Sequence, residues 1–161
     1  MLNKTAKTFL KQLIETTSPS GFETEIQNVI RERVDKFSDT VQSDVHGNLI
    51  FALNPEGSPR IMLAGHCDEI GMMITYVDKE GFLYVDSIGG VDPNSLPGQR
   101  VVVHGTRDIP GVVGKKALHL TTSEERKKAK KMEDLWIDIG AKNKKEAEKI
   151  VSIGDPITVA A

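Results

Sequence analysis

The stretch Arg60-Ile-Met-Leu-Ala-Gly-His66-Cys-Asp68-Glu69-Ile-Gly-Met72 decides the fold that we predict for this chain. Its four apolar residues, 61–64, are typical of a strand that is buried on both faces of a sheet. A His-x-Asp-Glu cluster follows directly, where such a strand would end. Polar side chains at the ends of buried strands are the usual place for chemistry in an α/β fold. The stretch therefore predicts an α/β domain with a candidate site at residues 66–69.

His66 and Asp68 are the candidate site residues. They are two positions apart, so in extended backbone their side chains point to the same side and that of Cys67 points away. A carboxylate beside a histidine can fix the imidazole tautomer and raise its basicity, which a metal site requires. The pattern is short, and it also fits a hydrogen-bonded histidine that binds no metal.

Further blocks flank this cluster in a fixed order. They are Ser18-Pro-Ser-Gly-Phe-Glu23, Asp44-Val-His-Gly-Asn48, Gly90-Val-Asp92, Gly111-Val-Val-Gly114 with His119 after it, Glu133-Asp-Leu-Trp-Ile-Asp-Ile-Gly-Ala141 and Gly154-Asp-Pro156. In order and spacing the blocks resemble the M42 family of metallo-aminopeptidases over essentially the whole chain. That family includes proteins labelled glutamyl or deblocking aminopeptidases, and some labelled endoglucanases.

The resemblance implies a two-metal hydrolase that releases amino-terminal residues from peptides, with zinc or cobalt as the ions. It makes His66 a metal ligand and Asp68 the catalytic-site carboxylate that orients it. The bridging aspartate, the paired glutamates, a later aspartate and a final histidine are expected beyond Ala161. We therefore expect the amino-terminal half of such an enzyme, inactive by itself, either as a truncated gene product or as part of a longer protein.

The expected fold class is α/β in two parts. Residues 1–69 are expected to begin a zinc-peptidase-like catalytic domain, with an amphipathic helix over about 3–16. Residues 70–161 are expected to form a small β-barrel-like domain, because short apolar runs alternate with turns rich in Gly, Pro, Asp and Asn. These runs are 71–77, 82–87, 99–104, 110–113, 135–139 and 157–160. The resemblance assigns this second part to dimerisation and ends the chain at the return to the catalytic domain.

Three capping boxes are predicted, each a Ser, Thr or Asn followed three residues later by Glu. They pair Ser20 with Glu23, Thr122 with Glu125, and Asn143 with Glu146. The helices that they begin are expected to carry an apolar face up to residue 37, to span 126–132, and to span 144–150. The Ser-Pro-Ser-Gly turn before the first of them is explained by turn chemistry alone.

Composition limits the partners and the compartment. A hydrophobic content of 39% and a net charge of −2 argue against a nucleic-acid or membrane partner. A single cysteine, Cys67, and an amino terminus without a signal peptide fit a reducing cytoplasm. Peptide substrates and a homo-oligomer, either a dimer or a larger assembly of dimers, are the expected partners.

Two alternatives to an aminopeptidase stay open at this stage. The chain can be a non-catalytic oligomerisation module, or a truncated remnant of such an enzyme. A glycosidase would need two carboxylates at a set separation, and no such pair is marked in the sequence. Cys67 and His66 are neighbours that face opposite ways in a strand, so they do not suit a nucleophile–base pair.

Overall fold

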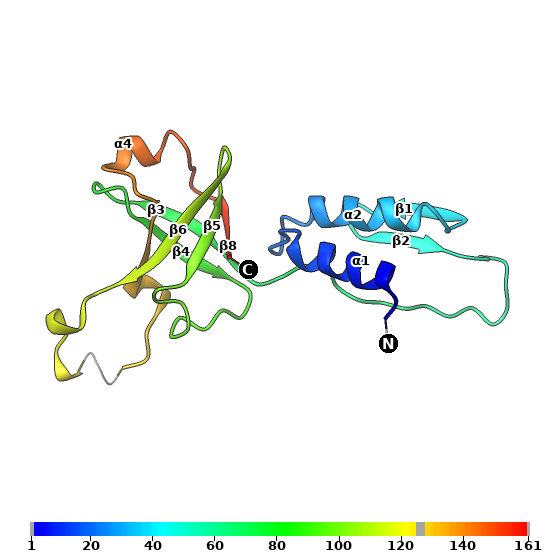
Figure 1. Ribbon diagram of the computed structural model, residues 1–161, viewed down its shortest axis with the longest axis horizontal. Coiled ribbons are helices and arrows are strands. Elements are labelled where there is room, and N and C mark those ends of the chain that lie inside the picture. Colours follow the sequence, from blue (N-terminus) through cyan, green and yellow to red (C-terminus); the bar gives the residue numbers. More distant parts are fainter. Residues whose placement is uncertain (1, 125–127, 161) are drawn as a thin grey trace. The chain divides into compact units, whose positions relative to one another are not determined.

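The computed structural model describes residues 2–124 and 128–160. The chain divides into two compact units, Met1–Glu69 and Ile70–Ala161 (Figure 1). The first unit combines helices with a two-stranded sheet, and the second contains a closed barrel of six strands. The expected combination of α/β content with a β-barrel is therefore present.

The first unit begins with a helical pair. Its elements are α1 (Lys4–Glu15), α2 (Thr24–Val34), β1 (Thr40–Ser43) and β2 (Leu49–Ala52). Helix α1 has the predicted span, and the side chain of Asn3 caps it by accepting a hydrogen bond from the Ala6 amide at 2.8 Å. Strands β1 and β2 form an antiparallel hairpin in which Val41 pairs with Phe51.

The capping box predicted for α2 is wrong. Glu23 occupies the N-cap position without a side-chain cap, and its carboxylate instead accepts a hydrogen bond from the Gly21 amide at 2.8 Å. The Ser20 hydroxyl points elsewhere, to Asp68. The reason is the start of the helix: α2 begins at Thr24, so Ser20 lies three residues before the N-cap position.

The strand predicted over residues 61–64 is also absent from the described structure. The segment belongs to no sheet, and the side chains of Ile61, Met62 and Leu63 are 81%, 88% and 93% exposed. A strand is buried on both faces only where neighbouring strands and a covering layer exist. In the described part of this unit the only sheet is the β1–β2 hairpin, whose strands pair with each other.

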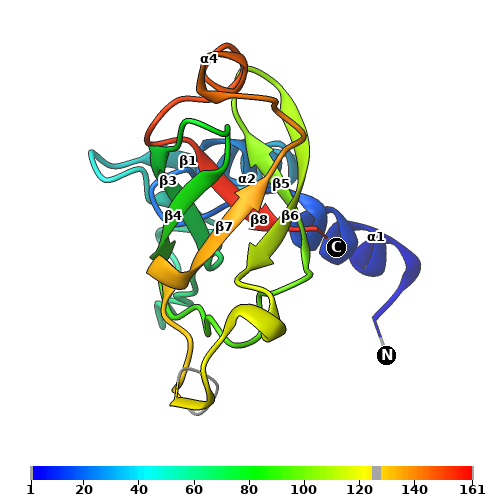
Figure 2. The ribbon, with the colours of Figure 1, turned by 90° about the vertical axis from the view of Figure 1, so that its left-hand side faces the viewer.

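The second unit is the barrel, whose ring of strands is seen in Figure 2. Its strands are β3 (Gly71–Val77), β4 (Leu83–Ile88), β5 (Arg100–His104), β6 (Asp108–Lys115), β7 (Leu135–Asp138) and β8 (Pro156–Val159). They close in the order β3-β4-β7-β6-β5-β8, and all neighbours are antiparallel. Each strand begins and ends within two residues of the corresponding ends of a predicted run. Closure satisfies the backbone groups that an open sheet leaves at its edges.

The barrel interior is the main hydrophobic core of the chain. Inward and outward side chains alternate along most of the strands, as the two-residue period of a strand requires. The exceptions are β3, whose register shifts after Ile74, and β8, in which three successive residues are buried. In β5, Val101 and Val103 face inward, and in β7, Leu135 and Ile137 do so. Leu83, Ile74, Met72 and Ile157 complete the most deeply buried set.

Short helices lie in the connections of the barrel unit: η1 (Leu118–Leu120), η2 (Met132–Asp134) and α4 (Lys144–Ala147). Asn143 caps α4 as predicted, through Oδ1 and the Glu146 amide at 3.0 Å, but the helix ends at Ala147 rather than at residue 150. The predicted helix over 126–132 and its cap residue Glu125 lie partly outside the described residues. In the described part, residues 128–131 are not helical.

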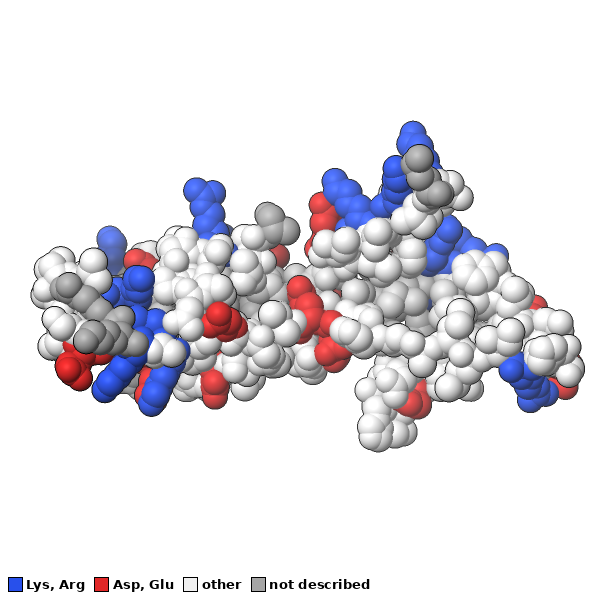
Figure 3. Space-filling view, turned by 90° about the horizontal axis from the view of Figure 1, so that it is seen from below, with Lys and Arg blue, Asp and Glu red and all other residues white. Residues whose placement is uncertain are grey.

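Among the described residues, no helix combines the length and the apolar composition that crossing a membrane requires. On the face shown in Figure 3, acidic and basic side chains lie interspersed with uncharged ones. This mixture agrees with the small net charge of the chain.

Candidate functional site

The structure brings His66 and Asp68 together. Nδ1 of His66 lies 2.9 Å from Oδ1 of Asp68 and 3.2 Å from the Asp68 carbonyl oxygen. Both oxygens accept hydrogen bonds, so we assign the imidazole proton to Nδ1. Nε2 then keeps its lone pair, on a side chain that is 85% exposed. This is the orientation in which a histidine can bind a metal ion through Nε2.

Asp68 has a second partner that the sequence did not indicate. Oγ of Ser20 donates a hydrogen bond of 2.5 Å to Oδ2 of Asp68, so each carboxylate oxygen has its own donor. Both bonds lower the pKa of the Asp68 carboxyl below its ordinary value, and the bond from Ser20 has the larger effect. Asp68 is thus held as a carboxylate next to the imidazole.

The backbone beside this carboxylate is joined to the Ser-Pro-Ser turn. Pro19 and Glu69 form a parallel β-bridge, in which the Glu69 amide donates to the Ser18 carbonyl at 2.8 Å. The Ser18 amide in turn donates to the Glu69 carboxylate at 2.9 Å. Ser18 and Pro19 are both buried. The turn, which the sequence explained as a structural element alone, is therefore also the support of the candidate site.

Cys67 lies apart from the His66–Asp68 pair. Its Sγ accepts a hydrogen bond from Nε2 of Gln27 on α2 at 3.4 Å. Burial raises the pKa of the Cys67 thiol, and the nearby carboxylates of Glu23 and Asp68 raise it further. The Cys67 side chain is partly rather than fully buried, and a raised pKa lowers the share of the nucleophilic thiolate.

The other three histidines lie in strands, turns and short helices away from the His66–Asp68 pair in the sequence. His104 on β5 bonds through Nδ1 to Asp108 at 2.8 Å and through Nε2 to Thr158 at 2.9 Å. Thr158 is buried, so the histidine satisfies a hydroxyl that would otherwise lack a partner. The backbone amide of His46 donates to Asp44 in the β1–β2 turn, and His119 lies in η1.

A metal ion would need more ligands than this site offers. Catalytic zinc sites draw on about three protein ligands. In the described ranges, 2–124 and 128–160, no three His, Cys, Asp or Glu side chains come together as a metal-binding group. His66, oriented by Asp68, can supply one ligand of a metal centre. The described residues do not supply the other ligands.

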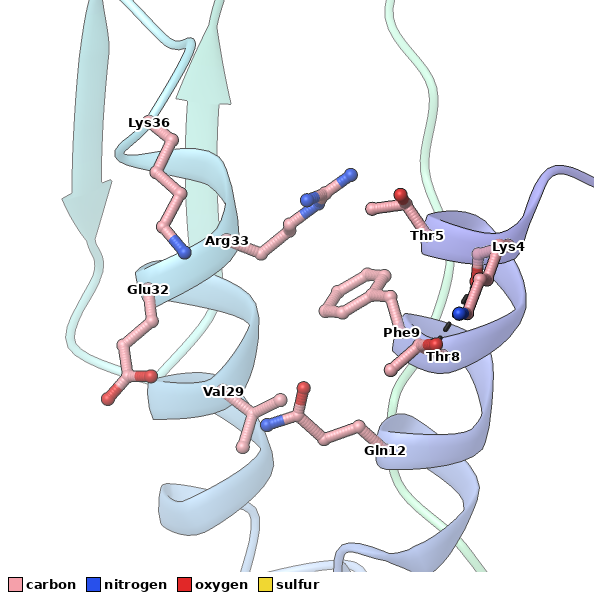
Figure 4. A pocket seen from close by; sticks show the side chains of 9 residues that line it. All are labelled: Lys4, Thr5, Thr8, Phe9, Gln12, Val29, Glu32, Arg33 and Lys36. Carbon is pink, nitrogen blue, oxygen red and sulfur yellow. Dashed lines mark hydrogen bonds between the residues drawn. The ribbon is translucent and has the colours of Figure 1, made fainter.

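A groove of about 350 Å³ lies between α1 and α2, away from the candidate site residues (Figure 4). In it the Arg33 guanidinium lies 5.5 Å from the centroid of the Phe9 ring, and the two side chains face each other between the helices. Lys4, Lys36 and Glu32 also line the groove. This stacking is a cation–π contact that joins the helices.

The family is established by comparison with known proteins. The M42 glutamyl aminopeptidase family matches residues 47–161 of this chain, which is more than half of its length. The chain belongs to this family, as its sequence blocks predicted.

Individual relatives agree with this assignment. A putative aminopeptidase of Acetivibrio thermocellus is 39% identical over 146 residues, which are 91% of this chain and 42% of the relative. The TET aminopeptidase structure from the marine sediment archaeon Thaumarchaeota archaeon SCGC AB-539-E09 is similar with a TM-score of 0.89 at 37% identity, covering 95% of this chain and 43% of that one. The TET1 peptidase of Pyrococcus horikoshii, described as assembling into a tetrahedron or a large octahedral shell, gives 0.82 at 35% identity, with coverages of 94% and 46%. The chain thus spans less than half the length of the relatives that it matches.

Proposed function

We propose that this chain contributes the first metal ligand of a metal-dependent aminopeptidase. The observation that carries the proposal is the His66–Asp68 pair, in which the carboxylate engages Nδ1 and leaves an exposed Nε2 free to bind a metal ion. Family membership supplies the reaction class, since the matched family is one of glutamyl aminopeptidases. Residues 1–69 would then begin the catalytic domain, and peptides with a free amino terminus would be the substrates.

The chemistry of the ligands suits zinc or cobalt, because imidazole and carboxylate together favour such ions. In a two-metal site the ions polarise the scissile carbonyl and lower the pKa of a bound water. The part played by this chain is narrower. Asp68 holds the imidazole of His66 in the Nδ1–H tautomer, and His66 presents Nε2 to one ion. Since the described residues supply no further ligand group, we propose that this chain alone is inactive.

We further propose that the barrel, residues 70–161, is an oligomerisation domain that forms a dimer or a larger assembly of dimers. Support comes from the Pyrococcus horikoshii relative, which is described as assembling into closed shells. The barrel has a closed strand ring and its own buried core, so it does not depend on the first unit for its interior. This independence also favours the second candidate function, a non-catalytic oligomerisation module. A dimeric mass in light scattering supports the oligomerisation domain, and a monomeric mass contradicts it.

A chimera separates the two candidates. This chain would be joined to the part of the Acetivibrio thermocellus aminopeptidase that follows the matched 146 residues. Release of amino-terminal residues from peptides would be measured with zinc or cobalt present, for the chimera and for the chain alone. We expect metal-dependent activity only in the chimera, and its loss in the His66→Ala variant.

The matched control is His46→Ala, which removes an imidazole from the β1–β2 turn and should leave the activity unchanged. Equal activity of the His66→Ala chimera and its parent would refute the ligand assignment. Chelator-sensitive hydrolysis by the chain alone would refute the claim that it is inactive. A folded but inactive chimera would favour the oligomerisation module.

A further inference from the structure

Ser20 is the one residue of the Ser-Pro-Ser turn whose side chain bonds to the Asp68 carboxylate. We propose that Ser20 is a positioning residue: its hydroxyl holds Oδ2 of Asp68 so that Oδ1 stays directed at Nδ1 of His66. The proposal rests on the proposed function, in which His66 is a metal ligand. It goes further by naming the residue, 48 positions away from Asp68, that sets the geometry of that ligand.

The geometry divides the two oxygens of the carboxylate between two donors. Ser20 Oγ lies 2.5 Å from Oδ2, and His66 Nδ1 lies 2.9 Å from Oδ1. The terminal torsion of an aspartate is broad, so one hydrogen bond alone defines the carboxylate plane poorly. Two bonds to different oxygens define it well. Loss of the Ser20 bond would let the carboxylate turn away from the imidazole.

The imidazole has little else to hold it. The His66 side chain is 85% exposed, so packing does not fix its ring orientation. Its other hydrogen-bond contact given by the described residues is a 3.2 Å approach of Nδ1 to the Asp68 carbonyl oxygen. That contact is longer than the one to the carboxylate, and it lacks the charge that strengthens a hydrogen bond. The tautomer of His66 therefore depends mainly on Asp68, and the orientation of Asp68 depends on Ser20.

The hydroxyl of Ser20 is separable from the backbone support of the site. The bridge between Pro19 and Glu69 uses backbone groups, and the Ser18 hydroxyl donates separately to the Cys67 carbonyl at 3.0 Å. Ser20 also makes no contribution to the cap of α2, because Glu23 stands at the N-cap position. Removing the hydroxyl should thus leave the fold in place and change only the orientation of the Asp68 carboxylate.

The experiment compares the parent chain with Ser20→Ala, Ser20→Thr and the control Ser43→Ala. The Ser43→Ala change removes a hydroxyl of the same kind from β1, where it accepts a hydrogen bond from Arg31 at 2.6 Å. The imidazole ¹⁵N signals of His66 would be recorded without metal at about pH 8.5, some two units above the ordinary pKa of a histidine. These signals report which nitrogen carries the proton.

We expect a majority of the Nδ1–H tautomer in the parent, in Ser20→Thr and in Ser43→Ala, and loss of that majority in Ser20→Ala. Protection of the Glu69 amide against exchange should persist in Ser20→Ala, which separates a change of position from unfolding. In the chimera with the Acetivibrio thermocellus part, which would bring the missing ligands, the affinity for Zn²⁺ should fall about tenfold with Ser20→Ala, the lower end of the effects seen for groups that orient a ligand.

Two results would overturn the proposal: the same tautomer mixture in Ser20→Ala as in the parent, or an Nε2–H majority in the parent. Loss of Glu69 amide protection in Ser20→Ala would also count against it, since the hydroxyl would then hold the backbone. Failure of the proposed function has a different signature. In that case Zn²⁺ would leave the His66 signals of the chimera unchanged in every variant, while the metal-free tautomers would still follow Ser20.

Discussion

At the scale of single residues, the candidate site was accessible from the sequence because its two members are neighbours. His66 and Asp68 stand two positions apart, and the structure joins their side chains at 2.9 Å. The third member, Ser20, lies 48 positions away and sits in a turn with a sufficient local explanation. Spacing rules work within one element, so they give no access to a contact between two distant segments.

His104 shows the same limit. Its acceptor Asp108 is four residues away across a hairpin, and its second partner Thr158 is on another strand. No sequence pattern indicates this network, because the register of three strands decides it.

The carboxylate of Asp44, in the turn between β1 and β2, gives a prediction about the pH dependence of this turn. Asp44 accepts hydrogen bonds from the His46 amide and from both the amide and the side chain of Asn48. These bonds, above all that from the Asn48 side chain, lower the pKa of Asp44 below its ordinary value of 3.8. The stabilisation is fully present above about pH 3.8 and is lost as the pH falls through the lower pKa of the folded state.

We therefore expect the amide signals of His46 and Asn48 to shift toward their unfolded positions only below pH 3.8, in spectra recorded during an acid titration. The Asp44→Asn variant should show no such step. A turn that opens well above that pH would contradict the assignment.

At the scale of elements, the barrel strands were predicted closely, whereas the strand predicted over 61–64 does not form. The barrel strands are marked by signals within the chain: alternation of apolar residues and turn residues between runs. The 61–64 run carries the signal of a strand as well, yet burial also requires partners, and among the described residues none pairs with it. Local sequence thus predicts the tendency to form a strand but not the presence of its neighbours.

The barrel core gives a stability prediction with a matched pair. Ile137 on β7 is fully buried, and Ile153, also in the barrel unit, is 67% exposed. Replacing Ile137 by Ala should lower the free energy of unfolding of the barrel by about 2–5 kcal/mol, through lost burial and a residual cavity. The Ile153→Ala change should stay within about 0.5 kcal/mol. Urea unfolding followed by Trp136 fluorescence measures both, and equal effects would refute the core assignment.

At the scale of the whole molecule, the two units differ in how much apolar surface they bury. Nearly all fully buried side chains belong to the barrel, whereas in the first unit the buried apolar residues are Ile26, Val34 and Pro19. Burial of apolar surface is the main stabilising contribution to a fold. The barrel should therefore be the more stable unit.

Amide hydrogen exchange on the full chain tests this ranking. We expect the slowest exchange at barrel core positions such as Val103 and Ile137. Residues 61–65 should exchange near the rate of an unstructured peptide, because no backbone hydrogen bond joins them to another described residue. Strong protection of residues 61–65 would show that the segment has found a partner, and would contradict its exposure.

The central claim of this account is that His66 is the metal-binding histidine of the chain. The most direct test is a Zn²⁺ titration of the chimera, followed through the imidazole ¹⁵N signals of the four histidines that this chain contributes. The account predicts that Nε2 of His66 shifts first and alone, and that Asp68→Ala weakens the response. A His66 signal that stays fixed while His46, His104 or His119 takes up the metal would contradict it.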